Sequence, residues 1–342
     1  MGLTAGKLWR LRRLADEHGH FTMLAVDQRP PIERLVAAAR GEEGPRRDDV
    51  SAVKTLLMET LAGEVSAVLA DPLIAYPDGW RHLDPSRGLL VTLEHAVYDE
   101  GPGGRTSGPI PGWSVEKIAR MGADAVKVLA WYRPDADPAV REHQQEWVAE
   151  VGAACTRFDL PFVFELLVYP FAAVDGSGDD YAEDPGKRTE AVIESVEAFA
   201  DPSFGVDLFK LESPIPAVEV NDDDPVTAAA FAALDRAAGR PWVLLSAGAS
   251  AADFRRILGY ALDAGASGFL AGRAIWWESI GAFPDLDACR RSLTADAVPY
   301  LRTLIADTAR ARPWFDHPSY GPNGATLDGA GPDFASDYGH PR

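Results

Sequence analysis

Two lysines stand within short apolar runs of the sequence, where a charged side chain is unusual. Lys210 lies in the run 206–214, and Lys127 lies in the run 123–132. Burial lowers the pKa of an amine unless an anion compensates. A neutral lysine is a nucleophile, and its characteristic chemistry is a Schiff base with a carbonyl group. The pattern therefore predicts one reactive site in which both lysines lie close together.

The alternation of side chains along a strand predicts which residues share the interior with these lysines. Apolar residues flank Lys210, Lys127 and Glu165 on both sides, so each charged residue should face inward while its neighbours face the helices. Each also lies four positions past the expected start of its strand. We therefore expect the three side chains to meet at similar depth. Asp27, at the end of an earlier apolar run, should face the same cavity.

A purely structural explanation competes with the catalytic one. A single buried lysine and glutamate can form a structural ion pair. Two lysines with one glutamate leave an excess positive charge, which favours a catalytic site. For Asp27 alone the structural explanation is stronger, because a carboxylate at that position often caps the following loop.

Eight apolar runs typical of buried strands alternate with amphipathic stretches typical of helices. The expected strands are Phe21 to Asp27, Ser66 to Asp71, Gly88 to Leu93, Ala123 to Tyr132, Pro161 to Tyr169, Val206 to Glu212, Pro241 to Ser246 and Ser267 to Ala271. The expected helices are Asp48 to Ala62, Ser114 to Met121, Pro138 to Phe158, Lys187 to Phe199, Pro225 to Ala238 and Ala251 to Ala264. Ser114 and Ser250 are expected to cap the helices that follow them.

This alternation predicts an α/β protein with a single (β/α)8 TIM barrel of parallel strands. An open doubly wound sheet is the alternative, but no Gly-x-Gly-x-x-Gly motif follows the first strand. We expect the barrel to span residues 1–312. Residues 313–342 are rich in glycine, proline and aspartate and should form an irregular tail.

The last two expected strands end in small residues that could bind a phosphate. Ser246 and Gly248 follow the seventh strand, and Gly272 and Arg273 follow the eighth. The loops after these two strands are the frequent phosphate site of this barrel. Arg273 adds a cation that can bind an oxyanion with two donors. Either segment alone is a weak signal, but their joint position favours a phosphate-bearing substrate.

The composition narrows the choice of partners. The net charge of the 342 residues is −19, which argues against a nucleic-acid or anionic-membrane partner but not against a small anionic substrate. Cys155 and Cys289 are expected to be free thiols. With no apparent signal peptide and no long apolar segment, we expect a cytoplasmic protein. The sequence leaves open whether the chain forms a homo-oligomer.

Short motifs that carry these residues follow one another from the first strand to the eighth. They include Ala25-Val26-Asp27-Gln28-Arg29, Leu69-Ala70-Asp71-Pro72, Gly122-Ala123-Asp124-Ala125-Val126-Lys127, Phe164-Glu165-Leu166-Leu167, Lys210-Leu211-Glu212-Ser213-Pro214, Leu245-Ser246-Ala247-Gly248 and Gly272-Arg273-Ala274. Over about residues 20 to 280 the chain resembles the class I tagatose-1,6-bisphosphate aldolase family, which includes relatives acting on sulfofructose 1-phosphate.

The resemblance implies a carbon–carbon lyase that needs no metal or other cofactor. It implies that Lys210 forms the imine, that Glu165 transfers protons, and that Asp27 and Lys127 line the site. It also implies substrate-binding residues, namely Gln28, Arg29, Ser246, Gly248, Gly272 and Arg273, the last four around the 1-phosphate. The implied reaction cleaves a ketose 1-phosphate such as tagatose 1,6-bisphosphate to dihydroxyacetone phosphate and an aldehyde such as glyceraldehyde 3-phosphate. Sulfofructose 1-phosphate, which would give sulfolactaldehyde, is the alternative substrate.

One departure from the family pattern affects the far end of the substrate. The family usually has a glycine after Asp-Gln-Arg, whereas this chain has Pro30 and Pro31. Proline fixes φ and lacks an N–H group. We therefore expect a loop after the first strand that cannot present the usual backbone donors.

Two other functions remain open on the sequence alone. A metal-dependent class II aldolase needs a cluster of ligands such as histidines, yet only His95 lies near a strand end. A non-catalytic sugar-phosphate-binding barrel would keep the phosphate loops but could lose the lysine. The presence of Lys127, Glu165 and Lys210 favours an enzyme.

Overall fold

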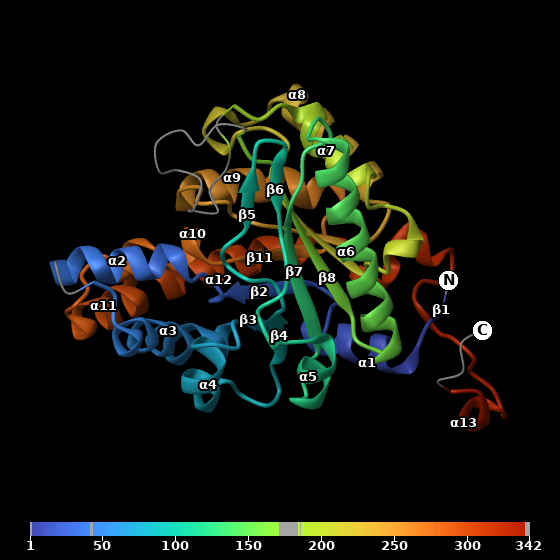
Figure 1. The fold of residues 1–342 in the computed structure, drawn as a ribbon, viewed down its shortest axis with the longest axis horizontal. Coiled ribbons are helices and arrows are strands. Elements are labelled where there is room, and N and C mark those ends of the chain that lie inside the picture. The colour runs from blue at the N-terminus through green and yellow to red at the C-terminus, as the bar shows by residue number, and fades with distance from the viewer. Residues whose placement is uncertain (1, 42–43, 171–183, 185, 339–342) are drawn as a thin grey trace.

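The computed structural model describes residues 2–41, 44–170, 184 and 186–338, and these contain a closed barrel of eight parallel strands (Figure 1). In sequence order the strands are β2 (Phe21–Ala25), β3 (Ala67–Ala70), β4 (Gly88–Thr92), β7 (Ala125–Trp131), β8 (Phe162–Leu167), β9 (Leu208–Leu211), β10 (Trp242–Leu244) and β11 (Gly268–Ala271). Each lies between its neighbours in sequence, and β11 closes the barrel against β2. The predicted fold class and all eight predicted strands are confirmed, although most strands are a few residues shorter than expected.

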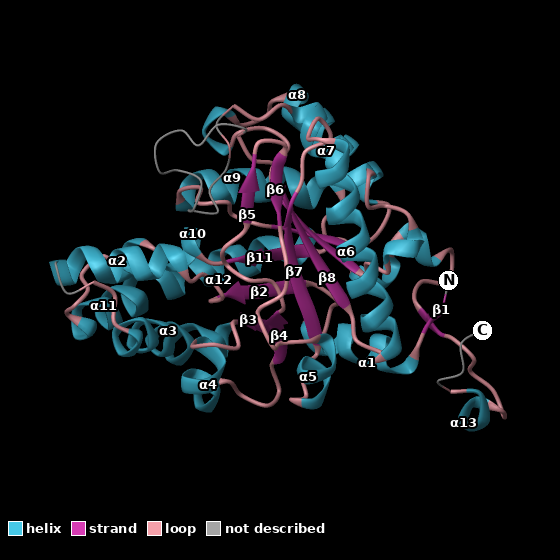
Figure 2. Ribbon diagram, viewed as in Figure 1, coloured by secondary structure: helices cyan, strands magenta, loops and turns pink. Residues whose placement is uncertain are grey.

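Helices surround the strands (Figure 2). All six expected helices are present, as α3 (Arg47–Leu61), α5 (Val115–Arg120), α6 (Pro138–Arg157), α7 (Thr189–Glu197), α8 (Pro225–Ala238) and α9 (Ala251–Ala264). Ser114 and Ser250 cap α5 and α9 as expected, since each hydroxyl oxygen accepts a backbone N–H from the first turn. The structure adds the unexpected helices α1 (Ala5–Leu14), α2 (Pro30–Arg40), α4 (Ala75–Gly79), α10 (Arg273–Trp276), α11 (Leu286–Ser292), α12 (Val298–Asp307) and α13 (Phe334–Asp337).

The expectation of a loop at Pro30 and Pro31 is wrong. Both prolines lie in the first turn of α2, and Arg29 is its N-cap residue. The first N–H groups of a helix have no partner within it, and the fixed φ of proline suits a helical start. The prolines therefore begin a helix immediately after the motif that contains Asp27.

The barrel interior is layered. Its lower part is filled by apolar side chains, among them Phe21, Met23, Leu90, Val163 and Leu208. Nearer the carboxyl ends of the strands lie the charged residues, and beyond them an apolar rim that includes Leu129, Trp131, Leu167, Tyr169 and Leu245. A separate and larger apolar layer packs between the strands and the helices. The alternation of each strand thus sorts its residues between these two environments.

Segments from the beginning and the end of the described chain meet at the floor of the barrel. Residues Gly2–Leu3 (β1) pair in parallel with Thr326–Leu327 (β12), and Leu3 packs in the apolar cluster of the lower barrel. Trp314 is buried in the same cluster as the lower barrel residues. The C-terminal segment beyond residue 312 therefore contacts the barrel. The division of the chain at residue 312 stays a prediction.

Candidate active site

Lys210 and Glu165 face each other on neighbouring strands inside the barrel. The register of β8 and β9 pairs Glu165 directly with Lys210, and Lys210 Nζ lies 2.9 Å from Glu165 Oε2. Lys210 is 4% exposed and Glu165 is 6% exposed. Phe209 and Leu211 pack in the outer apolar layer, so the inward direction predicted for Lys210 is confirmed.

Lys127 approaches the same glutamate from one strand further. In the register of β7 and β8 it pairs with Val163, one inward position below Glu165. Its long side chain spans this offset, and Nζ lies 2.8 Å from Glu165 Oε2 and 3.0 Å from Asp27 Oδ2. Glu165 Oε2 thus lies within 2.9 Å of both lysine nitrogens, and the four residues expected to meet do so. The expectation of similar depth is wrong for Lys127, whose position in β7 is lower than that of Glu165 in β8.

A third carboxylate, Glu94, completes this cluster and was not expected. Its Oε1 lies 2.6 Å from Lys127 Nζ, and the residue is 2% exposed. Glu94 lies just past β4, two residues after Thr92, whose hydroxyl donates to Asp27 Oδ2. Alternation continued past the expected strand end would have identified Glu94 as inward-facing. The excess positive charge expected here is therefore wrong, because three carboxylates accompany Lys127 and Lys210.

The environment drives the pKa values of these carboxyl groups apart. Burial alone would raise the pKa of Asp27 and Glu165, but the ammonium groups of Lys127 and Lys210 outweigh it and lower both pKa values. For Glu94, burial outweighs the attraction of Lys127 and Arg29, so its pKa is raised. Burial acts against a charged Lys127, yet Asp27, Glu165 and Glu94 together raise its pKa well above the usual value. Lys127 is thus held as a cation, and Glu94 is the carboxyl most disposed to carry a proton.

A small cavity of about 40 Å³ opens above these charges at the carboxyl ends of the strands. Nine of the ten site residues expected from the sequence line it, namely Asp27, Gln28, Arg29, Lys127, Glu165, Lys210, Ser246, Gly272 and Arg273. The tenth, Gly248, lies in an adjoining groove that shares Arg273 with the cavity. The active-site end of a TIM barrel is the end at which these residues gather.

The side of the cavity next to β10 and β11 is built from tight turns. Gly248 has φ +85°, a conformation that favours glycine, and a Cβ there would lie 3.5 Å from Arg273 Nη1. At Gly272 a Cβ would lie 2.5 Å from the carbonyl oxygen of Ala25, so a larger residue would push the turn away from β2. These glycines let Arg273 and the start of α9 come close to the cavity.

Comparison with known proteins identifies the family. The model of the DeoC/LacD family aldolases matches residues 21–278, which is most of the chain and includes all eight barrel strands. The chain belongs to this family.

Curated relatives match over nearly their whole length. The chain is 34% identical to a tagatose 1,6-diphosphate aldolase of Streptococcus agalactiae over 314 residues, covering 89% of this chain and 93% of the relative. It is 35% identical to one of Streptococcus pneumoniae over 293 residues, covering 83% and 88%.

Among solved structures, an archaeal fructose 1,6-bisphosphate aldolase has a TM-score of 0.56 at 20% identity, covering 88% of this chain and 98% of that one. The fructose-bisphosphate aldolase of Plasmodium falciparum has a TM-score of 0.63 at 13% identity, covering 91% and 97%. The two structures support the barrel fold.

Several buried polar atoms at the cavity make no hydrogen bond within the described part of the chain. They are Gln28 Oε1, Arg29 Nε, Arg29 Nη1 and Glu94 Oε2. Arg29 is tied to the cluster through Nη2, which donates to the carbonyl oxygen of Glu94 at 3.1 Å. Because an unpaired buried polar atom costs about 1–3 kcal/mol, such a concentration is typical of a ligand-binding site.

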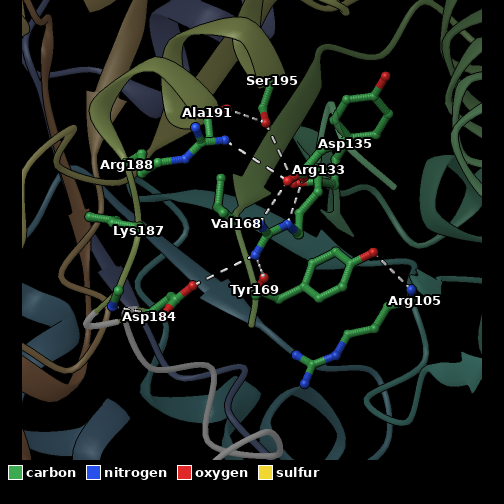
Figure 3. Close-up of polar contacts among 12 residues, drawn as sticks. Arg105, Arg133, Asp135, Val168, Tyr169, Asp184, Lys187, Arg188, Ala191 and Ser195 are labelled. Carbon is green, nitrogen blue, oxygen red and sulfur yellow. Dashed lines mark hydrogen bonds and ion pairs between the residues drawn. The ribbon is translucent and has the colours of Figure 1, made fainter. Parts of the chain in front are cut away.

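An arginine enclosed by aromatic rings stands at the rim over β7 and β8. The Arg105 guanidinium lies 4.4 Å from the ring centre of Tyr98, 5.0 Å from that of Trp131 and 4.9 Å from that of Tyr169. It extends from a hairpin formed by β5 (Asp99–Gly101) and β6 (Gly104–Thr106), and its backbone N–H donates to the Tyr169 hydroxyl (Figure 3). Arg133 reinforces this rim, because its Nη1 donates to the carbonyl oxygen of Tyr169.

The structure also bears on the other expectations drawn from the sequence. Cys155 and Cys289 are both free and buried, as expected. Across the described ranges, no group of three or more His, Cys, Asp or Glu side chains is arranged to hold a metal ion. The three carboxylates of the cavity instead surround the ammonium of Lys127. None of the described helices is both long enough and apolar enough to span a bilayer.

Proposed function

We propose that this chain is a Schiff-base aldolase that cleaves a ketose 1-phosphate resembling tagatose 1,6-bisphosphate. The products would be dihydroxyacetone phosphate and an aldehyde such as glyceraldehyde 3-phosphate. The observation that carries the proposal is the buried Lys210, 2.9 Å from the carboxylate of Glu165, within the cavity of a DeoC/LacD aldolase barrel. The names of the curated relatives support the choice of sugar.

The first half of the reaction forms an iminium on Lys210. Glu165 Oε2 is placed to accept a proton from Lys210 Nζ, which frees the amine to attack the C2 carbonyl. The carbinolamine then loses its hydroxyl as water once an acid has supplied a proton. The nitrogen lone pair forms the C=N bond as the C2–O bond breaks. The iminium is the electron sink for the bond between C3 and C4.

The second half breaks that bond and releases both products. A base removes the C4 hydroxyl proton, the C3–C4 electron pair moves into the iminium, and the aldehyde leaves behind an enamine. Protonation of C3 restores the iminium, and hydrolysis releases dihydroxyacetone phosphate and regenerates Lys210. Every step is a proton transfer, an addition to a carbon centre or an elimination from one, so the proposed mechanism needs no metal or other cofactor.

The carboxyl groups divide the acid and base roles in this scheme. Glu165 has a lowered pKa and is the base, whereas the raised pKa of Glu94 suits it to donate a proton. Lys127 stays charged between them and is suited to bind a substrate oxygen. Asp27 orients Lys127 or binds a hydroxyl group, and Gln28 and Arg29 provide unpaired polar atoms for the rest of the sugar.

The 1-phosphate would lie on the side of Ser246, Gly248, Gly272 and Arg273. Backbone N–H groups at the start of α9 and the Arg273 guanidinium can both bind phosphate oxygens there. This placement requires the phosphate-binding residues and Lys210 Nζ to be separated by the distance between the phosphate and C2 of the sugar.

A cleavage assay with a panel of substrates tests the proposal. Purified protein is mixed with tagatose 1,6-bisphosphate, fructose 1,6-bisphosphate or sulfofructose 1-phosphate, and dihydroxyacetone phosphate is measured over time. We expect the highest kcat/KM with tagatose 1,6-bisphosphate and unchanged activity in EDTA. A preference for sulfofructose 1-phosphate would correct the substrate, and binding of the sugars without cleavage of any would contradict the proposed activity.

A further inference from the structure

Another buried lysine, Lys54, lies outside the barrel cavity and hydrogen-bonds to the backbone next to a cavity residue. It belongs to α3 and is 0% exposed. Its Nζ donates to the carbonyl oxygen of Val26 at 2.9 Å and lies 2.5 Å from Asp71 Oδ2. Val26 immediately precedes Asp27, so this hydrogen bond ends one residue away from the charged cluster.

The carboxylate that holds Lys54 is itself fixed on all sides. Asp71 follows β3 and is also 0% exposed. Its Oδ1 accepts the backbone N–H groups of Leu73 and Ile74 at 3.0 and 2.8 Å, and its Oδ2 accepts that of Ala75 at 3.2 Å. The turn that leads into α4 therefore locks Asp71, and Asp71 locks the Lys54 ammonium.

The hydrogen bond to Val26 lies just past the end of β2, at the last backbone contact with β3. β2 ends at Ala25, and the backbone N–H of Val26 still donates to the carbonyl oxygen of Leu69 at 2.9 Å. From Asp27 to Arg29 the chain then crosses the cavity mouth before α2 begins at Pro30. Lys54 supplies a rigid hydrogen bond at the first step of this crossing.

Stability alone is a weak reason for such a pair. A fully buried ion pair is often no better for stability than well-packed apolar residues of similar size. Positioning gives a stronger reason, because Asp27 Oδ2 must lie 3.0 Å from Lys127 Nζ, and a displacement of about 1 Å can reduce a rate by about 10²-fold.

We propose that Lys54, held by Asp71, is a positioning residue that fixes the backbone at Val26 and thereby sets Asp27 and Arg29 against the reactive cluster. This inference rests on the proposed aldolase function and adds to it a support from outside the barrel. Lys54 and Asp71 touch no reacting atom in this scheme and act only through the segment 26–29.

The fold offers a matched control in a second buried pair. Lys7 of α1 is 8% exposed, and its Nζ lies 2.7 Å from Asp207 Oδ2 at the floor of the barrel. Lys54→Met and Lys7→Met each remove one ammonium from a buried ion pair. Only the first removes a hydrogen bond next to the cavity, so a general loss of stability affects both variants while a loss of positioning affects one.

The experiment compares the two variants in the cleavage assay at a temperature at which both are folded. We expect both to unfold at lower temperature than the wild type. We expect Lys54→Met alone to lose kcat, by about 10- to 100-fold, with a smaller change in KM. Lys54→Gln, which keeps a donor near Val26, should recover part of the lost kcat.

Equal kcat values in Lys54→Met, Lys7→Met and the wild type would overturn the inference. If Lys54→Met does not fold, Asp71→Asn carries the same test, and a normal kcat in that variant would overturn it equally. A wild-type protein that cleaves no ketose 1-phosphate would instead contradict the proposed function, so the two failures are distinguishable.

Discussion

The floor and the mouth of the barrel both bury lysines against carboxylates, but they do so in different ways. At the floor, Lys7 faces the single carboxylate Asp207, which also accepts the backbone N–H of Phe162 at 2.8 Å. At the mouth, Glu165 Oε2 is shared by Lys127 and Lys210, and Lys127 contacts two further carboxylates. The floor pair is one lysine with one carboxylate, whereas the mouth forms a chain of contacts between two lysines and three carboxylates.

The difference also appears in what is left unpaired. Atoms of Gln28, Arg29 and Glu94 at the mouth make no hydrogen bond within the described residues, although each is buried. A buried polar group left unpaired generally costs about 1–3 kcal/mol. Unpaired atoms beside shared charges thus mark a site organised for a ligand, and a single ion pair marks one organised for folding. Four substitutions test this contrast, in order of decreasing effect on activity.

Replacing Lys210 should have the largest effect. Lys210→Ala removes the only group proposed to bond to the substrate carbon, so kcat should fall by at least about 10⁴-fold. The measurement is the rate of dihydroxyacetone phosphate release, with circular dichroism as the control for folding. A folded Lys210→Ala protein with more than a few per cent of normal activity would place the nucleophile elsewhere.

Replacing Lys127 should affect both activity and folding. Lys127→Met leaves Asp27, Glu94 and Glu165 without the ammonium they share. Activity should fall by about 10²- to 10³-fold, and the free energy of unfolding should fall by about 3–5 kcal/mol at neutral pH. Urea titration and the cleavage assay measure the two losses. Normal kcat would show that the mouth cluster is structural, as the floor pair is.

Replacing Glu94 should change the pH dependence of stability. Because burial raises the pKa of Glu94 above 4.5, the folded state binds this proton more tightly than the unfolded chain. The contribution of Glu94 to the free energy of unfolding is therefore complete below pH 4.5 and declines as the pH rises through the raised pKa. Glu94→Gln cannot ionise and should lose this decline.

The carboxylates with lowered pKa values change the stability with pH in the opposite direction. For Asp27 and Glu165 the contribution to stability is present above the unfolded pKa and is lost on acidification. Urea unfolding of wild type and Glu94→Gln from pH 4 to pH 8 separates the two effects. If wild type and Glu94→Gln show the same stability at every pH, Glu94 is not the protonated carboxyl. If the fall of kcat/KM at high pH is the same in both proteins, Glu94 is not the general acid.

Replacing Lys7 should affect activity least. Lys7→Met leaves Asp207 buried without its cation, so the protein should unfold at lower temperature. We expect kcat within about twofold of the wild type, since neither Lys7 nor Asp207 is among the described residues that line the cavity. A large loss of kcat in a folded Lys7→Met protein would show that floor and mouth are coupled, and the contrast between them would fail.

Much of this arrangement could be predicted because alternation and topology act together. The inward direction of Lys127, Glu165 and Lys210 follows from period-two strands, and a closed barrel brings the carboxyl ends together. What alternation could not give was the register, which lowers Lys127 by one inward position relative to Glu165. Only the length of the lysine side chain restores the contact.

Other features of the site could not be predicted because they lie in segments beyond the strands, where the alternation of side chains no longer applies. Glu94 lies past the expected end of its strand, and Pro30 and Pro31 begin a helix that a loop-based interpretation missed. Lys54 and Asp71 come together from a helix and a strand end, 17 positions apart, so no local pattern linked them to Val26. The periodicity of hydrophobic residues within one element does not predict contacts between different elements.

Covalent trapping tests the central claim most directly. The protein is incubated with dihydroxyacetone phosphate and sodium borohydride, and the reduced imine is located by mass spectrometry of the digested protein, with Lys210→Ala as the control. We predict one adduct, on the peptide that contains Lys210, and none in the variant. An adduct on Lys127, or no adduct in a protein that still cleaves its substrate, would contradict the assignment of Lys210 as the imine-forming lysine.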